Sequence, residues 1–150
     1  EALREGAFDV IHKPLDIDKV VSLIKKAVKS IMILVVDDDM NTCETLKDVL
    51  EEKKYGVVVA QRGEEAIERV REDGIDIVLI DVNMPVLNGL ETYLAIKEIN
   101  PEITAVMITG YREDMAALVD KAINNNAYIC LYKPLDMDEV IAVINKICRA

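Results

Sequence analysis

The sequence predicts a doubly wound α/β fold, in which helices cover both faces of a parallel β-sheet. Apolar, strand-like runs alternate with amphipathic helical segments, and the breaks between them are short. Four of the strand-like runs lead into a polar residue that can do chemistry: an aspartate, a threonine or a lysine. Because the carboxyl ends of parallel strands share one edge of the sheet, these residues are expected to meet at a ligand-binding edge.

The first two β/α units follow from apolar periodicity. The run 31–36 is apolar and is followed by three aspartates, and the next helix is predicted to end near Tyr55-Gly56. Its apolar residues recur at helical spacing: Met40, Cys43, Leu46 and Leu50. A second strand is predicted over 56–60, followed by a charged helix over 63–73 that Gly74 ends.

The remaining three units repeat this alternation. The strand-like runs are 75–80, 103–108 and 128–132, and they lead into Asp81, Thr109 and Lys133. Turn formers predict a loop from Asp81 to Gly89 and then a helix over 90–99. The last two helices are expected from about Met115 to the break at 124–126 and from about Asp136 to Cys148.

Composition limits the function classes. The chain has 150 residues, enough for one domain and a fragment, and a net charge of −10, which disfavours direct binding to nucleic acid or an anionic membrane. Cys43, Cys130 and Cys148 lie in apolar patterns and are interpreted as reduced core thiols of a cytoplasmic protein. No run approaches the roughly 20 apolar residues of a membrane span, and no signal-peptide pattern opens the chain.

The first thirty residues repeat the last thirty. Lys13-Pro-Leu-Asp16 recurs as Lys133-Pro-Leu-Asp136, 120 positions later, and further matches occur at this offset without gaps. Two unrelated amphipathic helices are the alternative, but the repeat favours a fragment at 1–30, the closing strand and helix of an upstream related domain, before a complete domain at 31–150. The two copies could compete for one place, so 1–30 is expected to pack on a neighbour or to exchange between chains of a homodimer.

The acidic residues at the sheet edge predict a metal site. Asp37, Asp38 and Asp81 are expected within several ångströms, where like charges about 4 Å apart repel by roughly 4 kcal/mol at an effective dielectric near 20. A divalent cation relieves this repulsion, and hard oxygen ligands suit Mg²⁺. Asp39, at the entrance to the first helix, is interpreted as its N-cap.

The same edge carries groups that suit phosphoryl transfer. Asp81 is the candidate nucleophile, Lys133 a mobile cation for the phosphoryl group, and Thr109 a hydroxyl donor to one of its oxygens. Each residue alone has a simpler reading, as a turn start, a solvated turn and a strand end respectively. Their joint occurrence in this order favours the functional reading.

These residues give the chain a specific resemblance to the receiver domains of two-component response regulators, over about 31–150. The matching motifs are Asp37-Asp38, Asp81-Val-Asn-Met-Pro85, Gly89, Thr109 and Lys133-Pro134. The resemblance implies a flavodoxin-like fold with strand order 2-1-3-4-5 and phosphorylation of Asp81 from a histidine kinase or phosphotransfer protein. It further implies Mg²⁺ held by Asp38, Asp81 and the Asn83 carbonyl, with Asp37 acting through a metal-bound water. Segment 1–30 is similar to the end of a receiver, with Lys13 as its lysine.

The chain departs from the family three residues before the lysine. Receivers usually carry an aromatic residue there, whose rotation couples to the threonine, but this chain has Cys130. Tyr128 and Tyr132 share its strand face and could substitute, although packing is the alternative. Asn83 and Tyr111 are predicted to flank the path of an attacking water and to tune the lifetime of the phosphate.

Four kinds of function fit this sequence to different degrees. A phosphorylation-controlled signalling module, not an enzyme in the turnover sense, accounts for the whole motif set. A pseudo-receiver that only mediates protein contacts would be expected to lack one of the motif residues. A Mg²⁺-dependent phosphatase would usually have an acid where this chain has Asn83, and a nucleotide-binding fold would need a glycine-rich phosphate loop after the first strand.

Overall fold

The computed structural model describes residue 17, residues 30–110 and residues 115–149. The chain divides into two units, 1–30 and 31–150, and every element below belongs to the second. The elements are β1 (Met32–Val36), α2 (Met40–Glu52), β2 (Gly56–Ala60), α3 (Gly63–Glu72), β3 (Ile77–Asp81), α4 (Gly89–Ile99), β4 (Thr104–Gly110), α5 (Ala116–Asn124), β5 (Ile129–Lys133) and α6 (Met137–Arg149).

The five strands form one parallel sheet in the order β2-β1-β3-β4-β5, which confirms the predicted fold and strand order. The register pairs Val36 with Ile80, so the chain leaves β1 beside the end of β3. Gly110 pairs with Lys133, which brings the ends of β4 and β5 to the same edge. The residues predicted to act together therefore lie at neighbouring strand ends.

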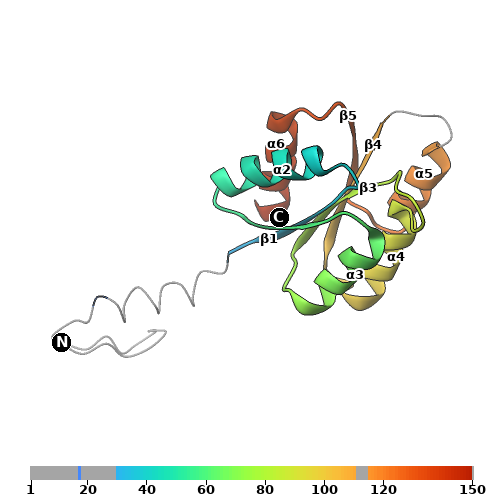
Figure 1. The fold of residues 1–150 in the computed structure, drawn as a ribbon, viewed down its shortest axis with the longest axis horizontal. Coiled ribbons are helices and arrows are strands. Elements are labelled where there is room, and N and C mark those ends of the chain that lie inside the picture. Colours follow the sequence, from blue (N-terminus) through green and yellow to red (C-terminus); the bar gives the residue numbers. More distant parts are fainter. Residues whose placement is uncertain (1–16, 18–29, 111–114, 150) are drawn as a thin grey trace. The chain divides into compact units, whose positions relative to one another are not determined.

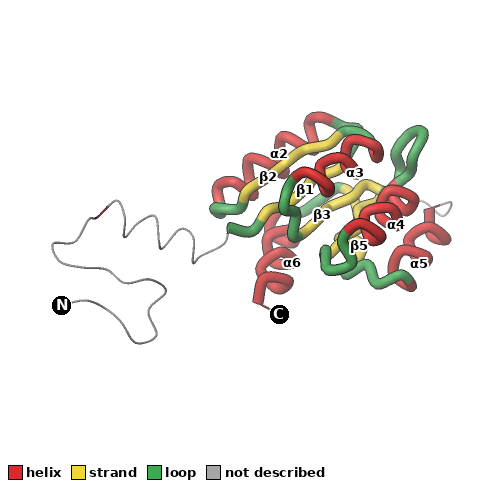
Figure 2. Tube along the Cα trace, turned by 90° about the horizontal axis from the view of Figure 1, so that it is seen from below, coloured by secondary structure: helices red, strands yellow, loops and turns green. Residues whose placement is uncertain are grey.

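The helices form two layers, one on each face of the sheet (Figures 1 and 2). Helices α2 and α6 cover one face, where Leu46 and Ile144 pack in an apolar core with Val35 and Leu79. Helices α3, α4 and α5 cover the other face, and Tyr93 and Ala122 belong to its core. Burial on both faces explains why the strands are almost continuously apolar.

Two details differ from the sequence interpretation. The first helix ends at Glu52, short of Tyr55-Gly56. The interpretation of all three cysteines as core thiols is wrong for Cys148, which is exposed, and Cys130 is only half-buried, whereas Cys43 is fully buried. Cys148 lies in the last turn of α6, and apolar periodicity does not show where a helix extends past the surface that covers it. Among the described residues, no helix has the length and apolar character needed to cross a membrane.

Candidate functional site

The turn between β1 and α2 is organised by its own aspartates. The Asp37 main-chain N–H donates to the Ala60 carbonyl at 3.1 Å, and one Asp37 carboxylate oxygen accepts from the Asp39 N–H at 2.9 Å. Asp39 in turn accepts from the Asn41 N–H at 3.0 Å, which confirms its role as the N-cap of α2. The cap places Asp37 and Asp38 at the sheet edge, before the helix begins.

Asp81 is the last residue of β3 and is 4% exposed. One of its carboxylate oxygens accepts from the Asn83 N–H at 3.1 Å. Helix α4 begins directly behind it, because a Cβ on Gly89 would lie 2.3 Å from the Asp81 carbonyl oxygen and 2.6 Å from the Val82 Cα. Only glycine permits this approach, and it fixes the start of α4 against the backbone of Asp81.

Lys133, at the end of β5, joins the two buried aspartates. Its Nζ donates to an oxygen of Asp37 at 3.1 Å and to an oxygen of Asp81 at 3.1 Å. The two carboxylate side chains are 2% and 6% exposed, whereas that of Lys133 is 30% exposed. The structure therefore brings together three residues that are 44 or more positions apart in the sequence, with the ammonium group on the solvent side.

The charges at this edge are unbalanced. Burial raises the pKa of Asp37 and the negative charge of Asp81 adds to this, while the Asp39 N–H and Lys133 oppose the shift. The pKa of Lys133 is also raised: burial, the largest single influence, lowers it, but the hydrogen bonds and charges of Asp37 and Asp81 together outweigh burial. One lysine thus compensates two buried carboxylates incompletely.

Asp38 completes an acidic cluster with Asp37 and Asp81, in which one carboxylate oxygen from each residue lies within 4.8 Å of the others. Asp38 is exposed, so the cluster is open to solvent on that side. Three hard oxygen donors at this spacing, with room for water, fit a hexacoordinate Mg²⁺. The predicted metal ligands Asp37, Asp38 and Asp81 are therefore assembled, and Asn83 follows two residues after Asp81.

Thr109 lies near this cluster but does not bond to it. Its hydroxyl is buried at 2% exposure and donates to the Gly110 carbonyl at 3.3 Å. Thr109 is one residue beyond Ile108, the register partner of Asp81, so its hydroxyl belongs to the same edge. Tyr111, predicted to flank the water path, lies outside the described residues, as does Lys13 of segment 1–30.

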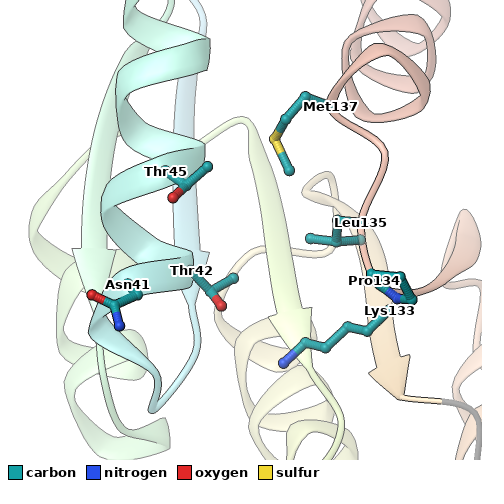
Figure 3. A pocket seen from close by; sticks show the side chains of 7 residues that line it. All are labelled: Asn41, Thr42, Thr45, Lys133, Pro134, Leu135 and Met137. Carbon is teal, nitrogen blue, oxygen red and sulfur yellow. The ribbon is translucent and has the colours of Figure 1, made fainter.

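Two features of the site were not predicted from the sequence. The Cys43 thiol, fully buried on α2, donates to the Asp37 carbonyl at 3.2 Å, and burial raises its pKa to about 11, so it stays a protonated donor. A cavity of about 290 Å³ also opens beside Lys133. Figure 3 shows Thr42 and Thr45 of α2 on one side of it and Leu135 and Met137 on the other. In the sequence, the polar residues on the first turns of α2 could have indicated this cavity.

The strand that ends in Lys133 has no aromatic residue in the core. Cys130 is half-buried against the core under α3, α4 and α5, and Tyr128 and Tyr132 are 41% and 50% exposed. If Tyr128 and Tyr132 serve in packing rather than as a switch, they do so at the rim of the sheet and not in the core.

A doubly wound sheet of this order, with an acidic cluster and a lysine at its carboxyl edge, defines a receiver-type α/β domain. The chain belongs to the family described as response regulator receiver domains, whose model matches residues 33–145. It is 39% identical over 117 residues to the transcriptional regulatory protein ZraR of Escherichia coli K12, covering 78% of this chain and 26% of that protein. It is 33% identical over 117 residues to the transcriptional regulatory protein CpxR of the same strain, covering 78% of this chain and 49% of that protein.

Solved structures agree with this assignment. A response regulator receiver domain protein from Clostridium thermocellum aligns with a TM-score of 0.72 and 30% identity, over 79% of this chain and 95% of that one. The chemotaxis protein CheY4 of Vibrio cholerae shares the fold, with a TM-score of 0.73 and 22% identity over 79% of this chain and 98% of that chain. The chain spans about a quarter of the length of ZraR and about half that of CpxR.

Proposed function

We propose that this domain is a phospho-accepting signalling module, in which Asp81 receives a phosphoryl group from the phosphohistidine of a histidine kinase or phosphotransfer protein. The observation that carries the proposal is the convergence of Lys133 on Asp81 and Asp37, at 3.1 Å from each, beside the open side of the acidic cluster. A merely structural ion pair would not need a third carboxylate, Asp38, at the same place.

In the transfer, a carboxylate oxygen of Asp81 attacks phosphorus, an O–P bond forms and the N–P bond to the donor imidazole breaks. The imidazole keeps the bonding electron pair and takes a proton from solvent. Asp81 is held for this attack, because the Asn83 N–H and Lys133 each bind one of its two oxygens and fix the orientation of the carboxylate. Lys133 would then follow the new phosphoryl oxygens, and Thr109 would donate its hydroxyl to one of them.

Mg²⁺ fits the acidic cluster, and Asp38, Asp81 and the main-chain carbonyl of Asn83 would hold it, with Asp37 acting through a bound water. When bound, it would neutralise negative charge on the transferring oxygens. The chain's own contribution is to keep the three carboxylates together despite their repulsion, which it does by binding Asp37 and Asp81 to main-chain N–H groups and pairing both with Lys133.

The donor protein would approach beside Lys133, where the cavity between α2 and the turn after β5 opens to solvent. Thr42 and Thr45 offer hydroxyls on one wall, and Met137 offers an apolar contact on the other. A cytoplasmic location is part of the proposal, because the buried thiol of Cys43 suits a reducing compartment.

Incubation with Mg²⁺ and acetyl phosphate, followed by intact mass spectrometry, tests the proposal. One phosphoryl adduct is expected, stable in acid and labile in base, absent from Asp81→Asn and retained in the control Asp73→Asn at the C-cap of α3. No adduct would support the pseudo-receiver alternative, and continuous release of phosphate without accumulation would support a phosphatase. Slower or faster loss of the adduct in variants of Asn83 or Tyr111 would test their predicted effect on phosphate lifetime.

We further propose that residues 1–30 are the closing strand and helix of an upstream receiver, a proposal supported by the 120-residue repeat of Lys13-Pro14 at Lys133-Pro134. Exchange of this segment between two chains would make a homodimer. Light scattering of the chain with and without residues 1–30 tests the exchange: the dimer should be lost with the segment, and a monomer in both cases would contradict it.

A further inference from the structure

The side chain of Tyr93 connects helix α4 with the end of helix α5. Tyr93 lies in α4, is 0% exposed, and its hydroxyl donates to the main-chain carbonyl of Asn125 at 2.5 Å. Asn125 is the C-cap of α5 and stands four residues before β5. A tyrosine hydroxyl that is buried with a main-chain partner 32 residues away is a long-range polar link inside an otherwise apolar core.

The α4 end of this link is fixed to the phosphoacceptor. The Gly89 N–H donates to the Val82 carbonyl at 2.9 Å, and the Gly89 Cα packs directly on the backbone of Asp81. Asn88 caps the helix in a reciprocal capping box with Glu91. Any displacement of the chain around Asp81 is therefore imposed on the first turn of α4, and Tyr93 follows one turn later.

The α5 end of the link is equally well tied to its surroundings. The Asn125 side-chain amide donates to the Lys121 carbonyl at 2.8 Å, and its main-chain N–H binds the last carbonyls of α5. The Ala127 N–H returns to the Ala122 carbonyl at 3.0 Å, and the Tyr128 N–H donates to the Ala105 carbonyl of β4 at 2.7 Å. The corner formed by residues 122–128 is therefore a hydrogen-bonded unit that leads directly into β5.

Both ends of strand β5 are consequently connected to Asp81, one to its side chain and the other to its backbone. Lys133 holds its carboxyl end to the Asp81 side chain, and the path Gly89, α4, Tyr93, Asn125 holds its amino end to the Asp81 backbone. Cys130, the position where receivers usually carry an aromatic residue, lies between the two and has only a small side chain that is half-buried. Among the described residues, the fully buried aromatic side chain is that of Tyr93 on α4, in the same core against which Cys130 packs.

We propose that Tyr93 is the coupling residue of this receiver: its hydrogen bond to Asn125 makes α4 and the corner 122–128 respond together when Asp81 is phosphorylated. The inference rests on the proposed phosphoacceptor function. In this proposal, α4 carries the conformational coupling that an aromatic residue at position 130 would otherwise provide. The change caused by phosphorylation is then expected to reach exposed residues where α5 leads into β5, among them Tyr128 and Ile129.

Hydrogen exchange of the full chain, with and without Mg²⁺ and beryllofluoride as a phosphoryl analogue, tests this. In the wild type, exchange is expected to change in the loop 82–88 and, by about fivefold or more, in residues 122–133. Tyr93→Phe, which removes only the hydroxyl, should keep the loop response and lose most of the response at 122–133. Tyr55→Phe removes another long-range hydroxyl bond, from the loop after α2 to Asn145 of α6 at 2.8 Å, and should leave both responses unchanged.

An undiminished response at 122–133 in Tyr93→Phe overturns the coupling role while leaving the phosphoacceptor function intact. No response in the wild-type loop 82–88 overturns the phosphoacceptor function, and the coupling role with it. If Tyr93→Phe does not fold, the carbonyl ¹³C shift of Asn125 in the wild type decides: it should move when beryllofluoride binds, and a constant shift overturns the inference.

Discussion

The ammonium group of Lys133 lies 3.1 Å from a carboxylate oxygen of Asp81, although 52 residues separate them in the sequence. The bond links the end of β5 to the end of β3, two strands between which β4 lies in the sheet. It is the contact that a phosphoryl group on Asp81 would have to share or replace. The stronger this contact is in the unphosphorylated protein, the more firmly it would hold the ends of β3 and β5 together before any phosphoryl group is bound.

Removal of the lysine charge is expected to destabilise the metal-free domain. Lys133→Met leaves Asp37 and Asp81 buried and unpaired, and the free energy of unfolding should fall by about 1–2 kcal/mol. This is less than the roughly 3–5 kcal/mol of a fully buried pair, because the lysine side chain is 30% exposed. Urea denaturation measures it, with Lys146→Met on the exposed side of α6 as the control. Mg²⁺ should restore more stability to Lys133→Met than to the wild type; equal stability of the variant and the wild type without metal would contradict the argument.

The buried charge of Asp37 is expected to cost stability at neutral pH. Its pKa is raised by burial above the usual 3.8, so the folded state binds this proton more tightly than the unfolded state and the associated stability is lost as pH rises through the folded pKa. Asp37→Asn should therefore be more stable than the wild type by about 1 kcal/mol at pH 7 without metal. Thermal melts from pH 7 toward pH 4 should show the difference shrinking, and a difference that grows in acid would refute the assignment.

Asp38 is expected to matter for the metal and not for the fold. It is exposed, and its carboxylate accepts no hydrogen bond among those found between described residues. Asp38→Asn should leave the metal-free free energy of unfolding within about 0.5 kcal/mol of the wild type. Mg²⁺ at 100 times its Kd should stabilise the wild type by about 2.7 kcal/mol and the variant far less. Asp48→Asn, at an exposed position of α2, is the matched control; an unchanged response to Mg²⁺ in Asp38→Asn would exclude that residue as a ligand.

The loop after Asp81 contains a strained residue. Val86 has φ of 65°, in the left-handed region that β-branched residues avoid, and is 93% exposed, while the Leu87 N–H donates to the Pro85 carbonyl across it at 2.8 Å. Val86→Asn should raise the free energy of unfolding by about 1 kcal/mol, since asparagine tolerates a positive φ better than a β-branched residue does and the valine side chain is almost fully exposed. Val86→Thr keeps the β-branch and should show no gain in urea denaturation. A stabilisation by threonine equal to that by asparagine would mean that hydrophobic exposure, and not strain, is relieved.

The acidic cluster and its lysine could be predicted from the sequence because each group directly ends a recognisable apolar run. Asp81 and Lys133 need only the rule that parallel strands share a carboxyl edge, and Asp39 needs only the local chemistry of a helix start. The bonds from Cys43 to Asp37 and from Tyr93 to Asn125 could not be predicted in this way. Both side chains fit the apolar periodicity of a helix, which indicates burial but not which main-chain carbonyl the buried donor will meet.

The groups around Asp81 come from three strands whose ends meet only in the assembled sheet. Residues 37, 81 and 133 are spread over most of the domain, so a ribosome must synthesise nearly all of it before the lysine exists to complete the pocket. Under the proposed function, an incompletely translated or unfolded copy would offer a phosphoryl donor only isolated carboxylates in water. Only chains that have finished folding would then accept the signal, so the architecture itself would act as a quality check.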